Sequence, residues 1–437
     1  MQRIPYKTDL SDYRADDSIP VIQPDHAFTV PPDRAGAWTV AGDIDGDGVA
    51  ELVQARLWDC NDVHAVVAVS AYRLDGTPLW NWGNPAEGVA ALHSDVPCQI
   101  HDWNRDGRQE VVVVMREHVV VLDGATGSEI FRFATPSTEA ADCIVFANLT
   151  NSDEDDILLK TRYTQIWAFT SKGKLLWNVE KPGGQLTAHQ PYPVDLDGDG
   201  VDEIAAGYAM LDHTGKLLWT VDAAVNLGKG HLDCIRLLRR GERPEDTRLV
   251  LTCCSGEALM CVDGCGELVW EVKGRHFESI NIGLFFPDSD EKSILVDIDH
   301  ADPGLGPLHV YDQDGALIGE INTIYSRHHP LITWGGEPLE RIVACEERML
   351  VSGDTGKPTA RFAMPSGKDM IFEQTERSRE HVTRGESHLL GLSANLFGNG
   401  CQDLMLSTNP GRAVWLYRNP GRSKDLSIGS GRNFTLY

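Results

Sequence analysis

The segment AGDIDGDGVAELV, residues 41–53, places a D-x-D-G-D-G loop between two short runs of apolar residues. The hairpin AYRLDGTPLW, residues 71–80, follows it and ends in tryptophan. Short alternating runs bounded by Gly and Asp turns are typical of β-strands. The two segments together predict a unit of four antiparallel strands. The acidic loop joins the first strand to the second, and the D-G turn joins the third to the fourth.

This order of elements recurs along the chain. The clearest other copy is VDLDGDGVDEIAAGYAMLDHTGKLLW, residues 194–219, and further copies occupy 100–130, 146–177, 261–270, 310–321, 349–362 and 394–419. Eight units begin near Trp38, Cys98, Cys143, Pro191, Leu232, Ser279, Pro330 and Leu389. Their spacing of about 50 residues is typical of four-stranded propeller blades.

The repeats therefore predict an all-β fold, a single β-propeller over residues 38–437. Eight blades are expected, and seven are the alternative if one weak unit is an insertion. Residues 1–37 are expected to form an N-terminal extension. To close the ring, the first strand would pair with the fourth strand or with the N-terminal strand HAFTV, residues 26–30.

The composition limits the partners of the chain. The formal net charge is -26, from 39 basic and 65 acidic residues among 437. This acidic excess argues against nucleic acid and anionic membrane as partners. The sequence lacks an apolar stretch of about 18 residues, so no transmembrane helix is expected. The N-terminus has no apolar signal-peptide core and the ten cysteines show no framework spacing. These features favour a cytoplasmic protein, or a secreted one if a leader preceded this sequence.

Three of the loops carry oxygen side chains at positions 1, 3, 5 and 9. Ca²⁺ binds such hard oxygen ligands, and glycine permits the sharp turns between them. An EF-hand is excluded because its Glu comes at position 12 and helices flank the loop. We expect structural Ca²⁺ in all three loops, on one face; the alternative is that the carboxylates cap backbone N–H groups without metal. The residues are Asp43, Asp45, Asp47 and Glu51; Asp102, Asn104, Asp106 and Glu110; and Asp195, Asp197, Asp199 and Glu203.

Histidines recur at one phase of the repeat, in the link that precedes the innermost strand. This link and the connection between the second and third strands emerge on the face opposite the acidic loops. Any one of these histidines could be a polar loop residue, but six of eight links carry one. The pattern predicts that this face binds a ligand. The histidines are His93, His189, His231, His276, His328, His329 and His388.

Units 3 to 5 bring further polar residues to the same face. The loop LLKTRYTQ, residues 158–165, is followed by the links TAHQPYP, residues 187–193, and KGHLDC, residues 229–234. Because the units are neighbours, these residues should converge. Removal of a proton α to a carboxylate requires a cation, a base and an acid for the leaving oxygen. The candidates are Arg162 and Lys160 for the cation, His189 and His231 for the base, and Tyr163 and Tyr192 for the acid. Asp233 and the remaining histidines would contact the substrate.

The D-x-D-G-D-G-x-x-E loops and the D-G-K-x-L-W hairpins resemble those of FG-GAP-type propellers. They are similar in particular to rhamnogalacturonan lyases, ulvan lyases and lyases of rhamnose-glucuronate linkages. The resemblance implies a carbon–oxygen lyase that cleaves a uronic-acid-containing, rhamnose-bearing glycan by β-elimination. These families pair histidine and tyrosine with arginine on one face, and the matching residues are His189, His231, Tyr163, Tyr192 and Arg162.

Two other function classes stay open at this point. One is a propeller glycoside hydrolase for the same sugars, although such an enzyme usually needs two opposed carboxylates. The other is a non-catalytic binding or scaffold propeller, because the repeat motif also occurs in non-enzymes such as integrin heads.

Overall fold

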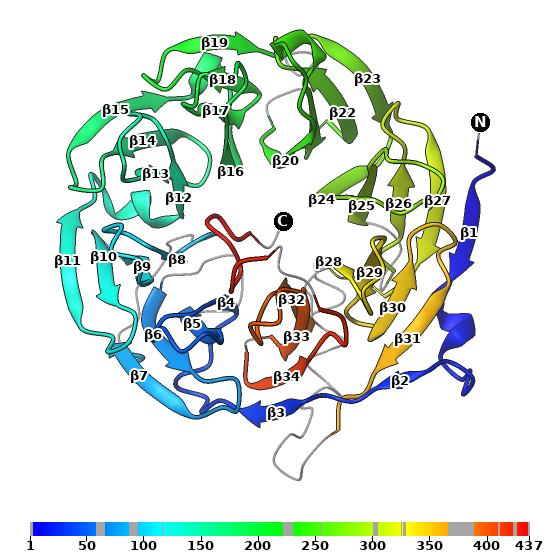
Figure 1. Cartoon of the computed structure of the whole chain (residues 1–437). Helices are drawn as coiled ribbons and strands as arrows, with labels where there is room; N and C mark the ends of the chain where they lie inside the picture. The colour runs from blue at the N-terminus through cyan, green and yellow to red at the C-terminus, as the bar shows by residue number, and fades with distance from the viewer. Residues whose placement is uncertain are drawn as a thin grey trace.

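The computed structural model describes residues 3–57, 66–86, 95–115, 117–221, 230–254, 256–299, 305–324, 326, 329–365, 389–409, 411–422 and 426–435. Their strands form eight sheets arranged in a ring (Figure 1). The prediction of an eight-bladed β-propeller is confirmed. No helix in the described ranges is long and apolar enough to cross a membrane.

The first four blades follow one another in the chain. Blade 1 contains β4 (Trp38–Gly42), β5 (Glu51–Leu57), β6 (Val66–Tyr72) and β7 (Pro78–Gly83). Blade 2 contains β8 (Cys98–His101), β9 (Glu110–Met115), β10 (His118–Asp123) and β11 (Glu129–Ala134). Blade 3 contains β12 (Cys143–Ala147), β13 (Asp156–Lys160), β14 (Gln165–Phe169) and β15 (Leu175–Glu180). Blade 4 contains β16 (Thr187–Val194), β17 (Glu203–Gly207), β18 (Ala209–Leu211) and β19 (Leu217–Thr220).

The other four blades continue the ring. Blade 5 contains β20 (Leu232–Arg239), β21 (Arg248–Cys253), β22 (Ala258–Asp263) and β23 (Leu268–Lys273). Blade 6 contains β24 (His276–Gly283), β25 (Ser293–Asp299), β26 (Leu308–Tyr311) and β27 (Leu317–Asn322). Blade 7 contains β28 (Leu331–Thr333), β29 (Glu340–Ala344), β30 (Met349–Ser352) and β31 (Pro358–Phe362). Blade 8 contains β32 (Leu389–Ala394), β33 (Asp403–Thr408) and β34 (Ala413–Tyr417). Short 3₁₀ turns lie at Leu10–Tyr13, Thr138–Ala141, Pro182–Gly184 and Pro244–Asp246.

The repeated turn and the terminal tryptophan join blades 1, 3, 4 and 5 to the blade that follows each of them. The Trp80 indole, on the last strand of blade 1, donates from Nε1 to the Gly124 carbonyl of blade 2 at 2.7 Å. Its ring lies where a Cβ on Gly127 would be, and Gly127 has a φ of 68°. Only glycine tolerates both conditions without strain. The same pairing occurs for Trp177 with Gly215, Trp219 with Gly266, and Trp270 with Gly315.

The N-terminal segment closes the ring, but not in the predicted arrangement. Strand β3 (His26–Thr29) pairs antiparallel with β34 and so becomes the fourth strand of blade 8. The innermost strand β4 pairs with β5 alone, since its other edge faces the axis. Strands β1 (Tyr6–Asp9) and β2 (Val21–Ile22) add parallel strands outside β27 and β31. The N-terminal segment thus runs around the outside of three blades (Figure 1).

Residues 426–435 lie inside the ring, a feature that the repeat pattern did not predict (Figure 1). They contact the innermost strands of six blades, or the residue directly after one. This segment therefore ties together blades that are far apart in the sequence. The contacts join Gly429 to Asn395, Ser430 to Ala41, Phe434 to Gln99, Asn433 to Phe146, and Thr435 to Gln190 and Arg236.

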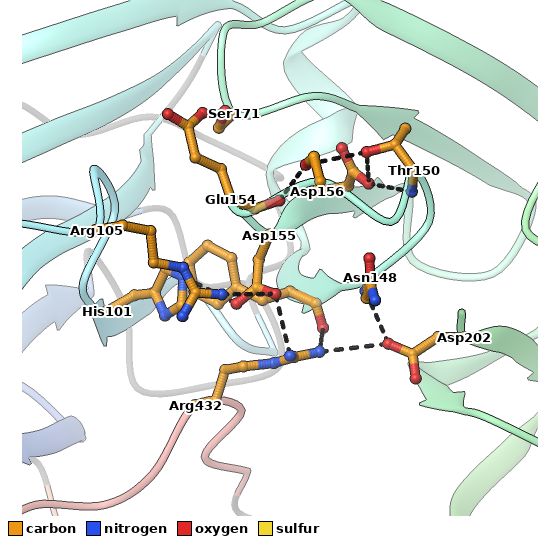
Figure 2. Close-up of polar contacts among 12 residues, drawn as sticks. His101, Arg105, Asn148, Thr150, Glu154, Asp155, Asp156, Ser171, Asp202 and Arg432 are labelled. Atoms are coloured by element: carbon orange, nitrogen blue, oxygen red, sulfur yellow. Dashed lines mark hydrogen bonds and ion pairs between the residues drawn. The ribbon is translucent and has the colours of Figure 1, made fainter. Parts of the chain in front are cut away.

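Arg432 is the charged anchor of this segment (Figure 2). Its Nη1 lies 3.1 Å from Asp155 Oδ1 and its Nη2 lies 3.4 Å from Asp202 Oδ2. Asp155 is buried and also faces His101 Nε2 at 3.1 Å and Arg105 Nη2 at 3.5 Å. Arg432 therefore links a buried carboxylate of blade 3 to a carboxylate of blade 4.

Arg432→Ala is expected to lower the free energy of unfolding by about 1–2 kcal/mol, because the buried Asp155 carboxylate loses a charged hydrogen-bond partner. Urea denaturation followed by tryptophan fluorescence would measure the change. Arg108→Ala is the matched control, since Arg108 pairs with Asp106 in an exposed loop. Equal unfolding midpoints for wild type and Arg432→Ala would contradict this anchoring role.

Candidate functional site

The ends of strands from blades 3 to 5 meet on the face opposite the acidic loops. Arg162 and Tyr163 lie in the connection from β13 to β14, His189 lies near the start of β16, and His231 directly precedes β20. The innermost strands β12, β16 and β20 are neighbours around the axis. Their topology therefore brings these four residues together, as the strand order predicted.

Tyr163 is at the centre of this cluster. Its ring stacks on the His231 ring with centroids 4.0 Å apart and meets the His189 ring edge-on at 5.4 Å. Its Oη lies 3.4 Å from His189 Nε2 and accepts a hydrogen bond from Arg162 Nε at 2.8 Å. A phenol, an imidazole and a guanidinium are thus within contact of one another.

Asp95, which the sequence analysis did not single out, orients His189. Asp95 Oδ2 lies 2.5 Å from His189 Nδ1, and Asp95 Oδ1 lies 3.5 Å from Arg162 Nη1. Although burial acts in the opposite direction, the charges of His189 and Arg162 hold the pKa of Asp95 below its usual range. The aspartate fixes Nδ1 as the donor and leaves Nε2 toward Tyr163. The available signal was its place in the link ALHSDVP, residues 91–97, two residues after His93.

Asp233 lies beneath the histidines, and not at the surface where a substrate ligand was expected. It is 3% exposed. Its Oδ1 is 3.2 Å from His231 Nε2 and 3.6 Å from His189 Nε2, and its Oδ2 is 3.7 Å from His276 Nε2. Burial and the charges of His189 and Arg162 lower the pKa of His231 to about 3. Asp233 therefore holds three histidines in place.

Lys160 differs from its expected role as a second cation for the substrate. Its side chain is completely buried and forms an ion pair with the equally buried Asp142. Its Nζ also donates to the Arg162 carbonyl at 2.6 Å. Lys160 thus supports the backbone of the loop that presents Arg162 and Tyr163, because an internal lysine must be paired with a carboxylate.

Tyr192 also lies away from the cluster. It is half-buried in β16, pairs with Ala205 of β17 and packs against the apolar core of blades 4 and 5. Tyr163 is consequently the phenol of the cluster.

The remaining predicted histidines have different surroundings. His276 Nε2 lies 3.0 Å from Glu278 Oε2. Burial opposes protonation there, but hydrogen bonds with Cys254 and Glu278 raise the pKa of His276 to about 11. His329 is buried, donates from Nε2 to the Ser326 carbonyl at 2.7 Å, and has its pKa lowered by burial to about 4. His329 is therefore a neutral internal residue and not a substrate contact. His93, His328 and His388 lie outside the described residues.

The carboxylates of the acidic loops cap backbone N–H groups and also lie close to one another. In each loop the Glu at position 9 accepts a backbone N–H from the residue after the first ligand position, at 2.8–3.1 Å. Carboxylate oxygens also cluster: those of Asp43, Asp45 and Glu51 lie within 4.8 Å of one another, as do those of Asp195, Asp197 and Asp199.

The charges around these loops differ from one loop to the next. In the first loop the Arg73 guanidinium contacts Asp45 and Asp47. In the second loop Asp102 Oδ1 is buried without a hydrogen-bond partner. This donor set fits a hard cation such as Ca²⁺, with Arg73 as a competing charge in the first loop.

No family model matches the chain. The chain is similar to two curated proteins of Bacillus subtilis (strain 168). It is 27% identical over 259 residues to the rhamnogalacturonan endolyase YesW. This alignment covers 44% of this chain and 40% of YesW. It is 22% identical over 445 aligned positions to the rhamnogalacturonan exolyase YesX. This alignment covers 86% of this chain and 70% of YesX. The match to YesW thus spans less than half the length of that relative.

The fold agrees with these similarities. The solved structure of the Bacillus licheniformis rhamnogalacturonan lyase PL11 superposes with a TM-score of 0.62 at 18% identity, and covers 94% of this chain and 76% of that one. The expected resemblance to rhamnogalacturonan lyases is confirmed. The FG-GAP description of the repeats and the likeness to ulvan lyases stay expectations.

Proposed function

We propose that this chain is a polysaccharide lyase that cleaves a pectic, rhamnose- and uronate-containing glycan by β-elimination. The observation that carries the proposal is the row of contacts from Asp95 through His189 to Tyr163, with Arg162 beside both ends. An oriented base, a phenol and a cation at one place are the groups that this elimination requires. The similarity to YesW and YesX supports the choice of glycan.

In this proposal Arg162 neutralises the uronate carboxylate, which makes the adjacent C5 proton more acidic. Its side chain is 21% exposed, whereas that of His189 is 5% exposed. His189 therefore receives the proton through Tyr163. The C4–O4 bond breaks as the C4–C5 double bond forms, and Tyr163 returns the proton to the leaving oxygen. The proton lost by carbon ends on the released hydroxyl group.

The buried carboxylates favour elimination over hydrolysis. Asp95, Asp142 and Asp233 are each bound to a histidine or a cation beneath the site. A glycoside hydrolase would need two carboxyl groups facing each other across the scissile bond. These aspartates instead stabilise the positions of the groups above them.

The test is a spectrophotometric assay with rhamnogalacturonan and a small panel of other uronate glycans. Elimination produces a conjugated, unsaturated uronate. The absorbance at about 235 nm should therefore rise together with the number of new reducing ends. New reducing ends without this absorbance would show hydrolysis. Binding without either product would show a non-catalytic propeller.

We also propose that Ca²⁺ is a structural ion of the three acidic loops. The clustered carboxylates and the buried Asp102 oxygen support this, and Ca²⁺ would join the first strand of a blade to its second. No step of the reaction passes through these ions, since the loops lie on the opposite face from His189.

Removal of Ca²⁺ is expected to lower the melting temperature, since an ion that binds only the folded state stabilises it by about 2.7 kcal/mol at 100 times its Kd. Differential scanning fluorimetry with EGTA, and then with added Ca²⁺, would measure the loss and its recovery. Asp102→Ala should reduce the response. An unchanged melting temperature in EGTA, together with no protein-bound calcium by elemental analysis, would refute the proposal.

A further inference from the structure

We propose that the chain holds a second kind of metal centre, for a zinc-type transition metal, under the histidine cluster. The ligands are Asp233, Cys254 and His276. One donor atom from each lies within 4.8 Å of the other two. They come from β20, from the residue after β21, and from the first residue of β24, so blades 5 and 6 both contribute.

The donor chemistry selects the metal. A thiol, an imidazole and a carboxylate together suit Zn²⁺, whereas Ca²⁺ and Mg²⁺ take oxygen ligands alone. This separates the centre from the acidic loops, which offer oxygen atoms and lie on the other face. Three protein ligands would leave one tetrahedral position for a further group.

Burial supports the presence of a cation. Asp233 is 3% exposed, and Glu278, which lies 3.0 Å from His276, is also 3% exposed. Positive charge placed between two buried carboxylates stabilises both of them. A divalent metal would supply it at the point where the side chains converge.

Asp233 connects this centre to the proposed reaction site. Its Oδ2 faces His276, and its Oδ1 faces both His231 and His189. Asp233, His189 and His231 themselves form a second group whose ligand atoms lie within 4.8 Å of one another. A metal that fixes Asp233 would thereby fix the two histidines, as second-sphere partners do around metal sites. Asp233, Cys254 and His276 are then positioning residues.

Cys253 and Cys254 are adjacent in the sequence. Cys253 is buried at the end of β21 and forms a hydrogen bond with Tyr208. Cys254 is more exposed and forms a hydrogen bond with His276 instead. The pair thus separates into one core cysteine and one cysteine at the metal ligands.

The experiment uses the full chain, stripped of metal, refilled with excess Ca²⁺ and titrated with Co²⁺. Wild type should bind one equivalent and show a thiolate-to-cobalt charge-transfer absorption in the near ultraviolet. Cys254→Ser should lose that absorption. Cys265→Ser, which changes an exposed cysteine in a hairpin turn, should keep it.

Failure to bind Co²⁺, or binding with the same spectrum in wild type and Cys254→Ser, would overturn the proposal. Zinc content of the protein as purified gives an independent reading, expected near one equivalent in wild type and Cys265→Ser and strongly reduced in Cys254→Ser. Neither measurement uses a glycan, so their outcome does not depend on the lyase proposal.

Discussion

His189→Ala is expected to lower kcat on the cleaved glycan by about 10²–10⁴, the usual contribution of a positioned general base. His189 Nε2 is 3.4 Å from Tyr163 Oη, and Asp95 fixes the other ring nitrogen. Without the imidazole, Tyr163 has no group to receive the proton. KM should change less than kcat, because the side chain is 5% exposed and contributes little surface to a substrate.

The control is His213→Ala, which removes an exposed histidine from a hairpin turn on the acidic-loop face. Its activity should equal that of wild type. The kcat of Asp95→Asn should fall between those of wild type and His189→Ala. The amide keeps the shape of the aspartate but not the charge that stabilises His189 once it has received the proton. A His189→Ala variant with a normal circular dichroism spectrum and kcat within a factor of about three of wild type would exclude His189 as the base.

The ring could be predicted because its determinants are local. In blades 1, 3, 4 and 5 a glycine with positive φ stands in the hairpin turn and a tryptophan follows four residues later, as for Gly76 and Trp80, so both are visible in one repeat. Five predicted unit starts coincide with the first residue of an innermost strand; Pro191, Ser279 and Pro330 fall within four residues of one. The contacts of residues 426–435 had no such signal, because their partners come from six different blades.

The site was partly predictable for the same reason. Strand order alone placed Arg162, Tyr163, His189 and His231 on one face, since each lies at a fixed phase of its unit. The pairing of charges beneath them was not predictable. Lys160 ends a strand next to a loop, and only the three-dimensional structure shows that it points inward to Asp142. Cys254 gains its meaning from His276, which is 22 residues away and on another blade.

Tyr163→Phe is expected to reduce kcat at least as strongly as His189→Ala, by about 10²–10⁴, because the proposed proton path passes through the phenol oxygen. The substitution removes only that oxygen. The ring should still stack on His231, so the shape of the surface is kept. Arg162 loses one acceptor but still faces Asp95, so binding of the uronate carboxylate, and with it KM, should change little.

Tyr192→Phe is the matched control, because it removes a hydroxyl from the neighbouring blade without touching the cluster. Steady-state rates at about 235 nm for the three proteins give the comparison, and equal melting temperatures would show that folding is unaffected. Full activity in Tyr163→Phe with loss of activity in Tyr192→Phe would transfer the acid role to Tyr192. Full activity in both would mean that the leaving oxygen takes its proton from His231 or from water. In either case Asp95 and His189 would have to act without the phenol that now separates them from the surface.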